Sequence, residues 1–340
     1  MKDLKYLLAY LLPLSAAVGL RFQGAWAWST VALAFGIIPL LEIWTPQSTL
    51  NTPPAEEDSR ARRFLFDALL YLNFPLLFVL YGGYLYTLQY TLLSAAGVAG
   101  LTLSLGIVVG AVGINIAHEL GHRHRRFEQQ MAQWMLLTAL YQHFFIEHNR
   151  GHHKHVATDL DPASARRGEP VFSFWWRSIC GGWKNAWRLE AERLRPAGLP
   201  VWSRHNDMLR FQITQILWLT AIGSLLGLKA LAGALAIALI GILLLETINY
   251  IEHYGLRRQI LPSGRPEPVS PAHSWNSNHE LGRIFLYELT RHSDHHYKAT
   301  RKYQILRHLD ESPQLPFGYP TSVLLALVPP LWFRVMHPRL

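Results

Sequence analysis

The stretch of sequence that decides the fold reads NIAHELGHRHRR (115–126) and, after an apolar run, FIEHNRGHHKHVATDLD (145–161). The first segment holds His118 and His122, four residues apart. The second segment repeats this spacing and adds one more histidine directly after it: His148, His152 and His153. Because residues four apart lie on one face of an α-helix, each pair is predicted to aim two imidazoles at one point, as a metal ion requires.

Two further histidine groups lie downstream, one in NYIEHYG (249–255) and one in RHSDHH (291–296). A zinc site takes three or four protein ligands, so the grouped histidines exceed one site and argue for two metal ions. Imidazole suits iron, copper and zinc alike, and the ligand type does not choose the metal. The candidate ligands are His118, His122, His148, His152, His153, His253, His292, His295 and His296.

The composition is that of a membrane protein. Half of the 340 residues are hydrophobic and 16% are charged, and the apolar residues come in long uninterrupted runs. Runs of about 17–26 residues can cross a hydrocarbon core of about 30 Å. We therefore predict an all-α polytopic membrane protein, a single domain over 1–340, with six spans at about 4–20, 26–44, 64–87, 91–116, 208–228 and 230–250.

The basic residues indicate how the chain is oriented. All lysines and arginines except Arg21 and Lys229 fall on the side of the predicted membrane that carries both termini and every histidine group. The positive-inside rule places that side in the cytoplasm, as a cap formed mainly by 118–207 and 251–340, and we expect a bacterial inner membrane. No nucleic-acid-binding motif accompanies the basic residues, so nucleic acid is not an expected partner.

Several segments have predictable positions in this layout. The fourth span runs into His118 without a proline or turn signal, so its helix is expected to project past the bilayer and carry HELGH at its end. Its glycines allow neighbouring helices to approach closely. The apolar runs 131–145 and 321–335 are expected to be buried or interfacial rather than spanning. FSFWWRSICGGWKNAW (172–187) has the aromatic and basic composition of a membrane-interface segment.

Carboxylates lie next to nearly every histidine group. A neighbour one position from a ligand points away from the ligand face, so it is expected to accept the N–H of the other ring nitrogen of a ligand and fix its tautomer. A carboxylate bridge between the metals stays open. The expected supporting residues, with three histidines that could serve in the same way, are Glu119, Glu147, Asp159, Asp161, Glu252, Asp294, His155, His273 and His279.

Taken alone, HELGH has the HExxH pattern of zinc metalloproteases, in which Glu119 would be the general base. That interpretation predicts an intramembrane protease and leaves the later histidine groups without a role. A metal transporter or sensor is a further alternative, but polar residues along a membrane pathway usually mark transport, and the predicted spans carry no charge at the bilayer midplane. The downstream histidines favour the two-metal interpretation.

Four motifs then resemble, in order and spacing, those of the integral-membrane alkane 1-monooxygenases: HELGHR (118–123), EHNRGHH (147–153), NYIEHYGL (249–256) and LTRHSDHH (289–296). The resemblance covers essentially the whole chain, including HSWNSNH (273–279) and GYP (318–320). The NYxEHYG motif is the specific one, because membrane fatty-acid desaturases and hydroxylases share only the general histidine pattern. Arg123 and Thr290 depart from the residues that are frequent in the family, lysine and glutamine.

The resemblance implies a non-haem di-iron centre held by the nine histidines. It also implies O₂-dependent hydroxylation of medium-chain linear alkanes to 1-alkanols, with electrons from rubredoxin and its reductase. The sequence has one cysteine, Cys180, and lacks the CxxC pairs of a rubredoxin, so the donor is expected to be a separate protein or a fused domain absent from this sequence. A fatty-acyl desaturase or hydroxylase on the same scaffold is the alternative within this superfamily.

An inert C–H bond offers no polar handle, so selectivity is expected to come from an apolar channel that delivers the chain end from the lipid to the metals. Residues one and two helical turns into the membrane from His118 and His253 are candidates for its lining, although ordinary helix packing explains them equally well. They are Ala111, Ile114, Ile242, Leu245 and Asn249.

Overall fold

A computed structural model describes residues 2–340, and in that range the chain is helical, with isolated β-bridges in place of strands. The prediction of an all-α protein with six membrane spans is confirmed. The helices long and apolar enough to cross a membrane are Asp3–Phe22, Gly24–Glu42, Phe64–Tyr90, Ala95–Gly121, Asp207–Leu226 and Leu228–His253.

The first four spans are built from consecutive helical pieces, and the last two are single helices, α13 (Asp207–Leu226) and α14 (Leu228–His253). The pieces of the first four are η1 (Lys2–Tyr10), α1 (Leu11–Phe22), η2 (Gly24–Trp28), α2 (Ser29–Ala32), η3 (Leu33–Ile37), α3 (Ile38–Glu42), α5 (Phe64–Tyr71), α6 (Asn73–Tyr90), α7 (Ala95–Val108), η4 (Val109–Ile114) and α8 (Asn115–Gly121).

The remaining helices are shorter, apart from one of 24 residues, α12. They are α4 (Pro54–Ala61), α9 (Arg126–Thr138), α10 (Phe144–Glu147), η5 (His148–His152), α11 (His153–His155), α12 (Val171–Leu194), η6 (Arg195–Ala197), η7 (Pro271–His273), α15 (Glu280–Phe285), α16 (His292–Tyr297), η8 (Tyr303–Ile305), α17 (Tyr319–Ala326), α18 (Pro329–Met336) and η9 (His337–Arg339).

The fourth span is the most buried of the six and forms the centre of the bundle. It packs on α14 at a point where both helices carry glycine. A Cβ on Gly110 would lie 3.1 Å from the carbonyl oxygen of Gly241, which is tighter than ordinary van der Waals contact, so glycine at this position favours the close approach of the two helices. The span continues without a break through α8, which brings HELGH to its end as predicted.

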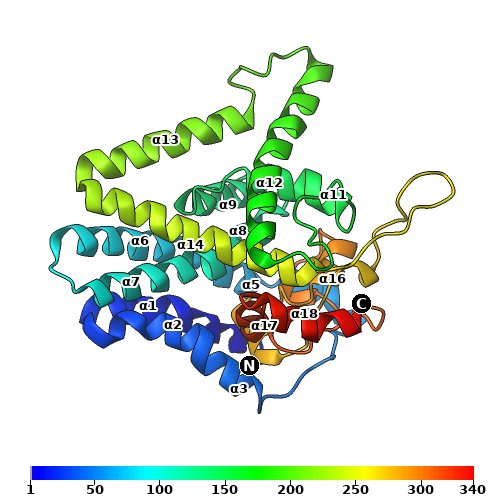
Figure 1. Cartoon of the computed structure of the whole chain (residues 1–340), viewed down its shortest axis with the longest axis horizontal. Coiled ribbons are helices and arrows are strands. Elements are labelled where there is room, and N and C mark those ends of the chain that lie inside the picture. Colours follow the sequence, from blue (N-terminus) through cyan, green and yellow to red (C-terminus); the bar gives the residue numbers. More distant parts are fainter. Residues whose placement is uncertain (1) are drawn as a thin grey trace.

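The other segments gather at one end of the spans (Figure 1). The short helices α11, α16, α17 and α18 lie there, whereas α12 runs across the direction of α6, α7 and α14. A helix that crosses the spans lies roughly along the membrane plane. Phe172 and Trp176 of α12 are exposed, which agrees with the predicted interfacial position. The apolar run near the C-terminus forms α17 and α18, each of eight residues and too short to span.

Candidate metal centre

Five histidines form the first of two groups at the end of α8. His118 lies in α8 and His122 directly after it, His148 and His153 lie in the consecutive helices η5 and α11, and His295 lies in α16. Three Nε2···Nε2 distances link the rings: His122 to His148 is 3.1 Å, His148 to His153 is 3.0 Å, and His153 to His295 is 3.1 Å. The five ligand atoms all lie within 4.8 Å of one another, so they surround one point.

The second group has four histidines, all buried: His152, His253, His292 and His296. His292 Nε2 lies 3.1 Å from His253 Nε2 and 2.9 Å from His296 Nε2. His296 Nε2 lies in turn 3.1 Å from His152 Nε2. A carboxylate oxygen of Glu252 is 3.2 Å from His292 Nε2, so an acidic oxygen faces the same point as the four imidazoles.

These distances fit metal coordination better than hydrogen bonding. A hydrogen bond needs one donor and one acceptor, and a neutral imidazole cannot serve several Nε2 partners at once. Nitrogens about 2.1 Å from one ion and about 90° apart around it lie about 3.0 Å from each other. His118 Nε2 is buried and has no hydrogen-bond partner among the described residues. Each group therefore has the donors and the spacing to hold a metal ion.

The helical form of η5 corrects one expectation from the sequence. The four-residue spacing predicted that His148 and His152 would share a point, but they belong to different groups. Residues 148–152 form a π-helical turn, in which i and i+5 are brought together. His148 therefore joins His153, and His152 turns to the other group. The two other pairs four apart, in α8 and α16, each stay within one group.

Burial keeps the imidazoles neutral, which is the state that binds a metal. It lowers the pKa of His122 to about 3 and the pKa of His148 well below its usual value, with the neighbouring histidines acting in the same direction. His152 differs: burial lowers its pKa, but the carboxylate of Asp161 outweighs that effect and raises it. Neutral rings do not have to release a proton before they bind an ion.

Two of the expected supporting carboxylates contact candidate ligands. Asp161 is buried and accepts from Nδ1 of His152 at 3.0 Å, which leaves Nε2 free to face the other histidines. Glu252 uses one oxygen to approach His292 Nε2 and the other to accept from the Tyr319 hydroxyl at 2.8 Å. Glu252 thus faces the site directly instead of supporting a ligand from behind.

Three other carboxylates hold the surrounding backbone and side chains. Glu119 accepts from Arg123 at 2.8 Å and also from the backbone N–H of Tyr303. Its carboxylate is therefore engaged away from the histidines, which does not fit a protease base. Glu147 accepts from Asn185 at 3.0 Å, and burial raises its pKa to about 7. Asp294 accepts from Arg301 and from the backbone N–H of Arg307, so it ties the segment after α16 to the ligand helix.

The remaining supporting candidates do not contact a ligand through their side chains. The Asp159 side chain is 86% exposed and lies 3.5 Å from Arg257. His155 is half-buried, and its ring makes no hydrogen bond within residues 2–340; only its backbone carbonyl accepts, from Thr158. The His273 ring contacts Glu267, and only its backbone carbonyl approaches His253 Nδ1, at 3.4 Å. His279 interacts with Gln47 and Ser277.

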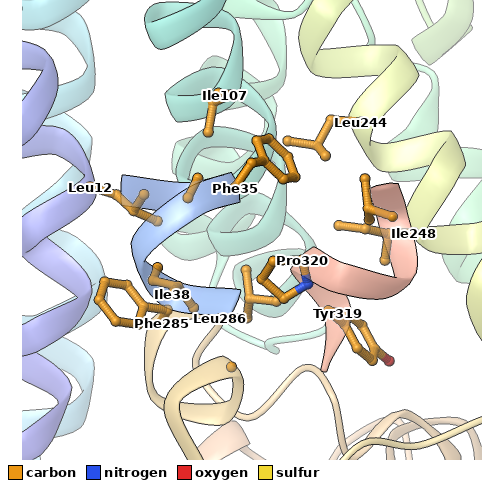
Figure 2. Close-up of a pocket in the computed structure, with 14 residues that line it drawn as sticks. Leu12, Phe35, Ile38, Ile107, Leu244, Ile248, Phe285, Leu286, Tyr319 and Pro320 are labelled. Atoms are coloured by element: carbon orange, nitrogen blue, oxygen red, sulfur yellow. The ribbon is translucent and has the colours of Figure 1, made fainter. Parts of the chain in front are cut away.

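A small apolar cavity of about 50 Å³ lies among the spans on the membrane side of this site. Figure 2 shows side chains from η3 and α3, α7, α14, α15 and α17 around it. Tyr319 lines the cavity, and its hydroxyl donates to Glu252, so the cavity borders the four-histidine group through two side chains. The full lining is Leu12, Ala34, Phe35, Ile38, Ile107, Ala111, Leu244, Ile248, Gly282, Phe285, Leu286, Tyr319, Pro320 and Val323.

Of the five channel candidates, Ala111 lines this cavity and the other four do not. On α14 the cavity is lined by Leu244 and Ile248, which are four apart and share a face. Ile242 and Leu245 lie on other faces of the helix. Asn249 lines a separate, small polar cavity beside Tyr141 and Glu246, and Ile114 is buried in the bundle core.

Sequence reasoning missed the cavity residues from the first two spans and from α15, such as Phe35 and Phe285. No motif marks them, because they are apolar residues in apolar segments and only helix packing brings them together. Tyr319 belongs to the GYP segment, which is part of the resemblance to the family, but the sequence alone did not indicate that it would line a cavity.

The six apolar helices identify a multi-pass membrane protein, and the two histidine groups at one end of the bundle are candidate metal sites. Residues 93–325 match the family model described as fatty acid desaturase. The chain is 41% identical to alkane 1-monooxygenase 1 of Pseudomonas aeruginosa, over 92% of this chain and 83% of that protein. It is 39% identical to alkane 1-monooxygenase 2 of the same organism, over 95% and 86%.

A more distant relative is the hydroxylase component of xylene/toluene monooxygenase from Pseudomonas putida, at 31% identity over 99% of this chain and 88% of that protein. The chain therefore belongs to the alkane 1-monooxygenase family, and its own match to the fatty acid desaturase model places it in that superfamily. It is an enzyme of that family, as its four motifs predicted.

Proposed function

We propose that the protein hydroxylates the terminal methyl group of medium-chain linear alkanes at a di-iron centre. In this reaction one atom of O₂ enters the 1-alkanol and the other leaves as water, with two electrons and two protons consumed. The observation that carries the proposal is the convergence of nine imidazoles into groups of five and four, beside an apolar cavity. The names of the relatives support the substrate class.

In this proposal each histidine group would hold one iron ion. His118, His122, His148, His153 and His295 would hold the first, and His152, His253, His292 and His296 the second. Glu252 would add an oxygen to the four-histidine group, so that each ion has five protein donors. The bound irons would supply the O₂ activation that cleavage of an inert C–H bond requires.

The chain's own residues would orient the substrate. The cavity lining is apolar, so binding of an alkane there would be favoured by contacts between its methylene groups and the apolar side chains. The end of the alkane chain would lie towards Tyr319 and Glu252. Holding the terminal methyl close to the site accounts for selectivity without any polar handle on the substrate.

The membrane position would serve both reactants. We propose that the spans lie in the bacterial inner membrane with the histidine groups and both termini on the cytoplasmic side, as the distribution of lysine and arginine favours. Alkanes dissolve in the lipid around the spans, and a soluble donor reaches the opposite, water-facing end. Rubredoxin, reduced by its reductase, is the proposed donor.

The test is a reconstituted reaction with octane, rubredoxin and rubredoxin reductase, combined with metal analysis of the purified protein. We expect 1-octanol and about two irons per chain, one for each histidine group. A protein that contains only zinc, or an iron-loaded protein that yields no 1-octanol, would contradict the proposal.

A fatty-acyl desaturase is the second candidate, because the matched family model carries that description. The same reconstituted system separates the two functions. Desaturated or hydroxylated acyl products from acyl-CoA or acyl lipid, in the absence of 1-octanol from octane, would favour the desaturase.

A further inference from the structure

Three tyrosines from distant parts of the chain form a buried aromatic cluster. Tyr6 lies in η1, Tyr287 follows α15, and Tyr303 lies in η8. The rings of Tyr6 and Tyr287 are stacked, with centroids 6.3 Å apart. Tyr303 meets both of them edge-on, at 5.5 Å from Tyr6 and 5.4 Å from Tyr287. Adjacent aromatic rings allow an electron to cross a protein interior in short steps.

One end of this cluster adjoins the five-histidine group. Tyr287 lines a cavity of about 10 Å³ together with the candidate ligands His118 and His295. A space of that size holds about one water molecule, so the phenol ring and the two imidazoles lie close to one another. Tyr287 is therefore in position to exchange an electron with the metal site.

The other end of the cluster reaches a polar cavity of about 440 Å³, which Tyr6 lines. Leu50 and Glu56 in its wall are exposed, so the cavity opens to the protein surface. Its volume is in the range of small-molecule sites. Two buried atoms of its lining, Arg291 Nε and Gln304 Oε1, have no hydrogen-bond partner within residues 2–340. They offer one donor and one acceptor to a polar molecule in the cavity.

The hydroxyl of Tyr6 is paired with a base. It donates to Glu288 Oε1 at 2.6 Å. Burial raises the pKa of Glu288, but the guanidinium groups of Arg283 and Arg291 outweigh that effect and lower it. The carboxylate is therefore ionised and can accept the phenol proton. A phenol gives up an electron much more readily when its proton can pass to such a base.

The turn that carries Tyr287 and Glu288 is strained. The two residues have φ angles of 50° and 60°, in the left-handed region that residues other than glycine rarely adopt. Strain of this kind persists where the surroundings impose it, and it is frequent at functional sites. Here it places the ring that adjoins the metal site directly beside the carboxylate that accepts from Tyr6.

We propose that Tyr287 and Tyr6 form a one-electron path from the polar cavity to the five-histidine group, and that a small polar thiol in the cavity is the reductant. The inference rests on the proposed function, in which O₂ is activated with two electrons and the alkane C–H bond supplies two more. When no alkane is bound, the path supplies those two electrons and protects the protein from oxidation at the site.

The electrons and protons of this protective reaction balance. Each electron leaves Tyr6 by way of Tyr287, and the hydroxyl proton of Tyr6 passes to Glu288. The thiol then gives one electron to the Tyr6 radical, Glu288 returns the proton, and the thiol proton enters solvent. Two oxidised thiols join as a disulfide. One O₂ thus takes up four electrons, two from the donor and two from the thiols, and leaves with four protons as two waters.

The test detects the tyrosine radical in the absence of alkane and of any other reductant. Protein loaded with iron(II) in nanodiscs is mixed with O₂ and frozen for electron paramagnetic resonance. We expect a tyrosyl signal from the wild type, which becomes narrower when the protein contains ring-deuterated tyrosine. Tyr6→Phe is expected to lose the signal, because its ring keeps the packing but has no proton to give to Glu288.

Tyr303→Phe is the matched control. Tyr303 belongs to the same cluster, but its hydroxyl donates to the carbonyl oxygen of Phe66 at 3.2 Å, which cannot take the proton away. This variant is expected to keep the radical signal. Melting temperatures of the metal-free proteins compare the folding of the variants. Glutathione is the thiol probe, and it is expected to remove the wild-type signal and to form one disulfide for each O₂ consumed.

Absence of a tyrosyl radical from the wild type would overturn the path, as would its persistence in Tyr6→Phe or its loss in Tyr303→Phe. A wild-type signal that glutathione leaves unchanged would overturn the role of the thiol. Oxidation of octane separates this test from the proposed function. If the wild type forms 1-octanol but no radical, the path alone is rejected, whereas an iron-loaded wild type that forms no 1-octanol rejects the hydroxylase.

Discussion

At the scale of single residues, hydrogen bonds to one ring nitrogen of a histidine determine which of its two nitrogens can face the metal site. Asp161 accepts from Nδ1 of His152, and Nε2 of that ring then faces the second group. Glu252 is shared between Tyr319 and the site. The difference between Asp159 and Asp161, two positions apart, follows from burial: one is exposed and the other contacts a candidate ligand.

Asp161→Asn is expected to weaken metal binding about 10- to 100-fold, because the amide is a poorer partner for the N–H of His152 than the carboxylate. The measurement is metal retention against a competing chelator at neutral pH. Asp159→Asn is the matched control and should retain metal like the wild type. Equal retention by both variants would show that the contact of Asp161 does not support the ligand.

A buried histidine outside both groups gives a separate prediction about pH. Burial lowers the pKa of His143 from its ordinary value of 6.5 to about 4. Its stabilising contribution is therefore present above pH 6.5 and is lost as the pH falls towards 4, because the unfolded chain takes up the proton first.

His143→Asn removes this titration, so the melting temperature of the variant should fall less than that of the wild type between pH 6.5 and pH 4.5. Thermal melts in one detergent at a series of pH values measure the difference. Parallel curves for the two proteins would mean that His143 is not a source of the acid sensitivity.

At the scale of elements, helical periodicity decides which residues act together. The α-helical spacing in α8 and α16 keeps pairs four apart within one group, and the π-helical turn of η5 divides such a pair. The sequence pattern of four-residue spacing was therefore a correct guide in two of the three segments. The exception could not be read from the sequence, because the turn depends on packing around Gly151.

Gly151 packs so closely that a Cβ there would lie 2.6 Å from Asn185 Nδ2 and 2.7 Å from Glu147 Oε1. Gly151→Ala is expected to destabilise the protein by about 1–3 kcal/mol and to reduce bound metal, because the added methyl group must displace either the π-helical turn or the hydrogen-bonded side chains of Glu147 and Asn185. Gly182→Ala in α12 is the control, since its Cβ would meet its nearest atom at 3.8 Å. Melting temperature and metal content are measured for both, and similar losses in the two variants would contradict the prediction.

The lining of the apolar cavity makes a prediction about substrate length. Ala111→Leu is expected to fill part of the cavity and shift the preference towards shorter alkanes, because Ala111 lines it. Leu245→Ala should leave the preference unchanged, since Leu245 lies outside the lining. Product yields from a series of linear alkanes test both variants. A shift with Leu245→Ala and none with Ala111→Leu would place the channel elsewhere.

At the scale of the whole molecule, the spans and the cap have separate roles. The bundle places apolar residues of six different segments around one cavity, and the segments at its end bring nine histidines within reach of each other. In the five-histidine group, His122 lines a recess between the segments that follow α8 and α16, whereas the four-histidine group borders the apolar cavity through Glu252 and Tyr319.

The sequence alone determined the six apolar helices, the continuation of the fourth one through α8 and the nine candidate histidines, because hydrophobic length, helical continuity and residue type are local properties of the chain. It also carried the four motifs that identify the family. The division into groups of five and four, the approach of Glu252 to the site and the lining of the cavity were decided by the tertiary structure. These features depend on how helices far apart in the chain rotate and pack against one another, and no local pattern encodes that rotation.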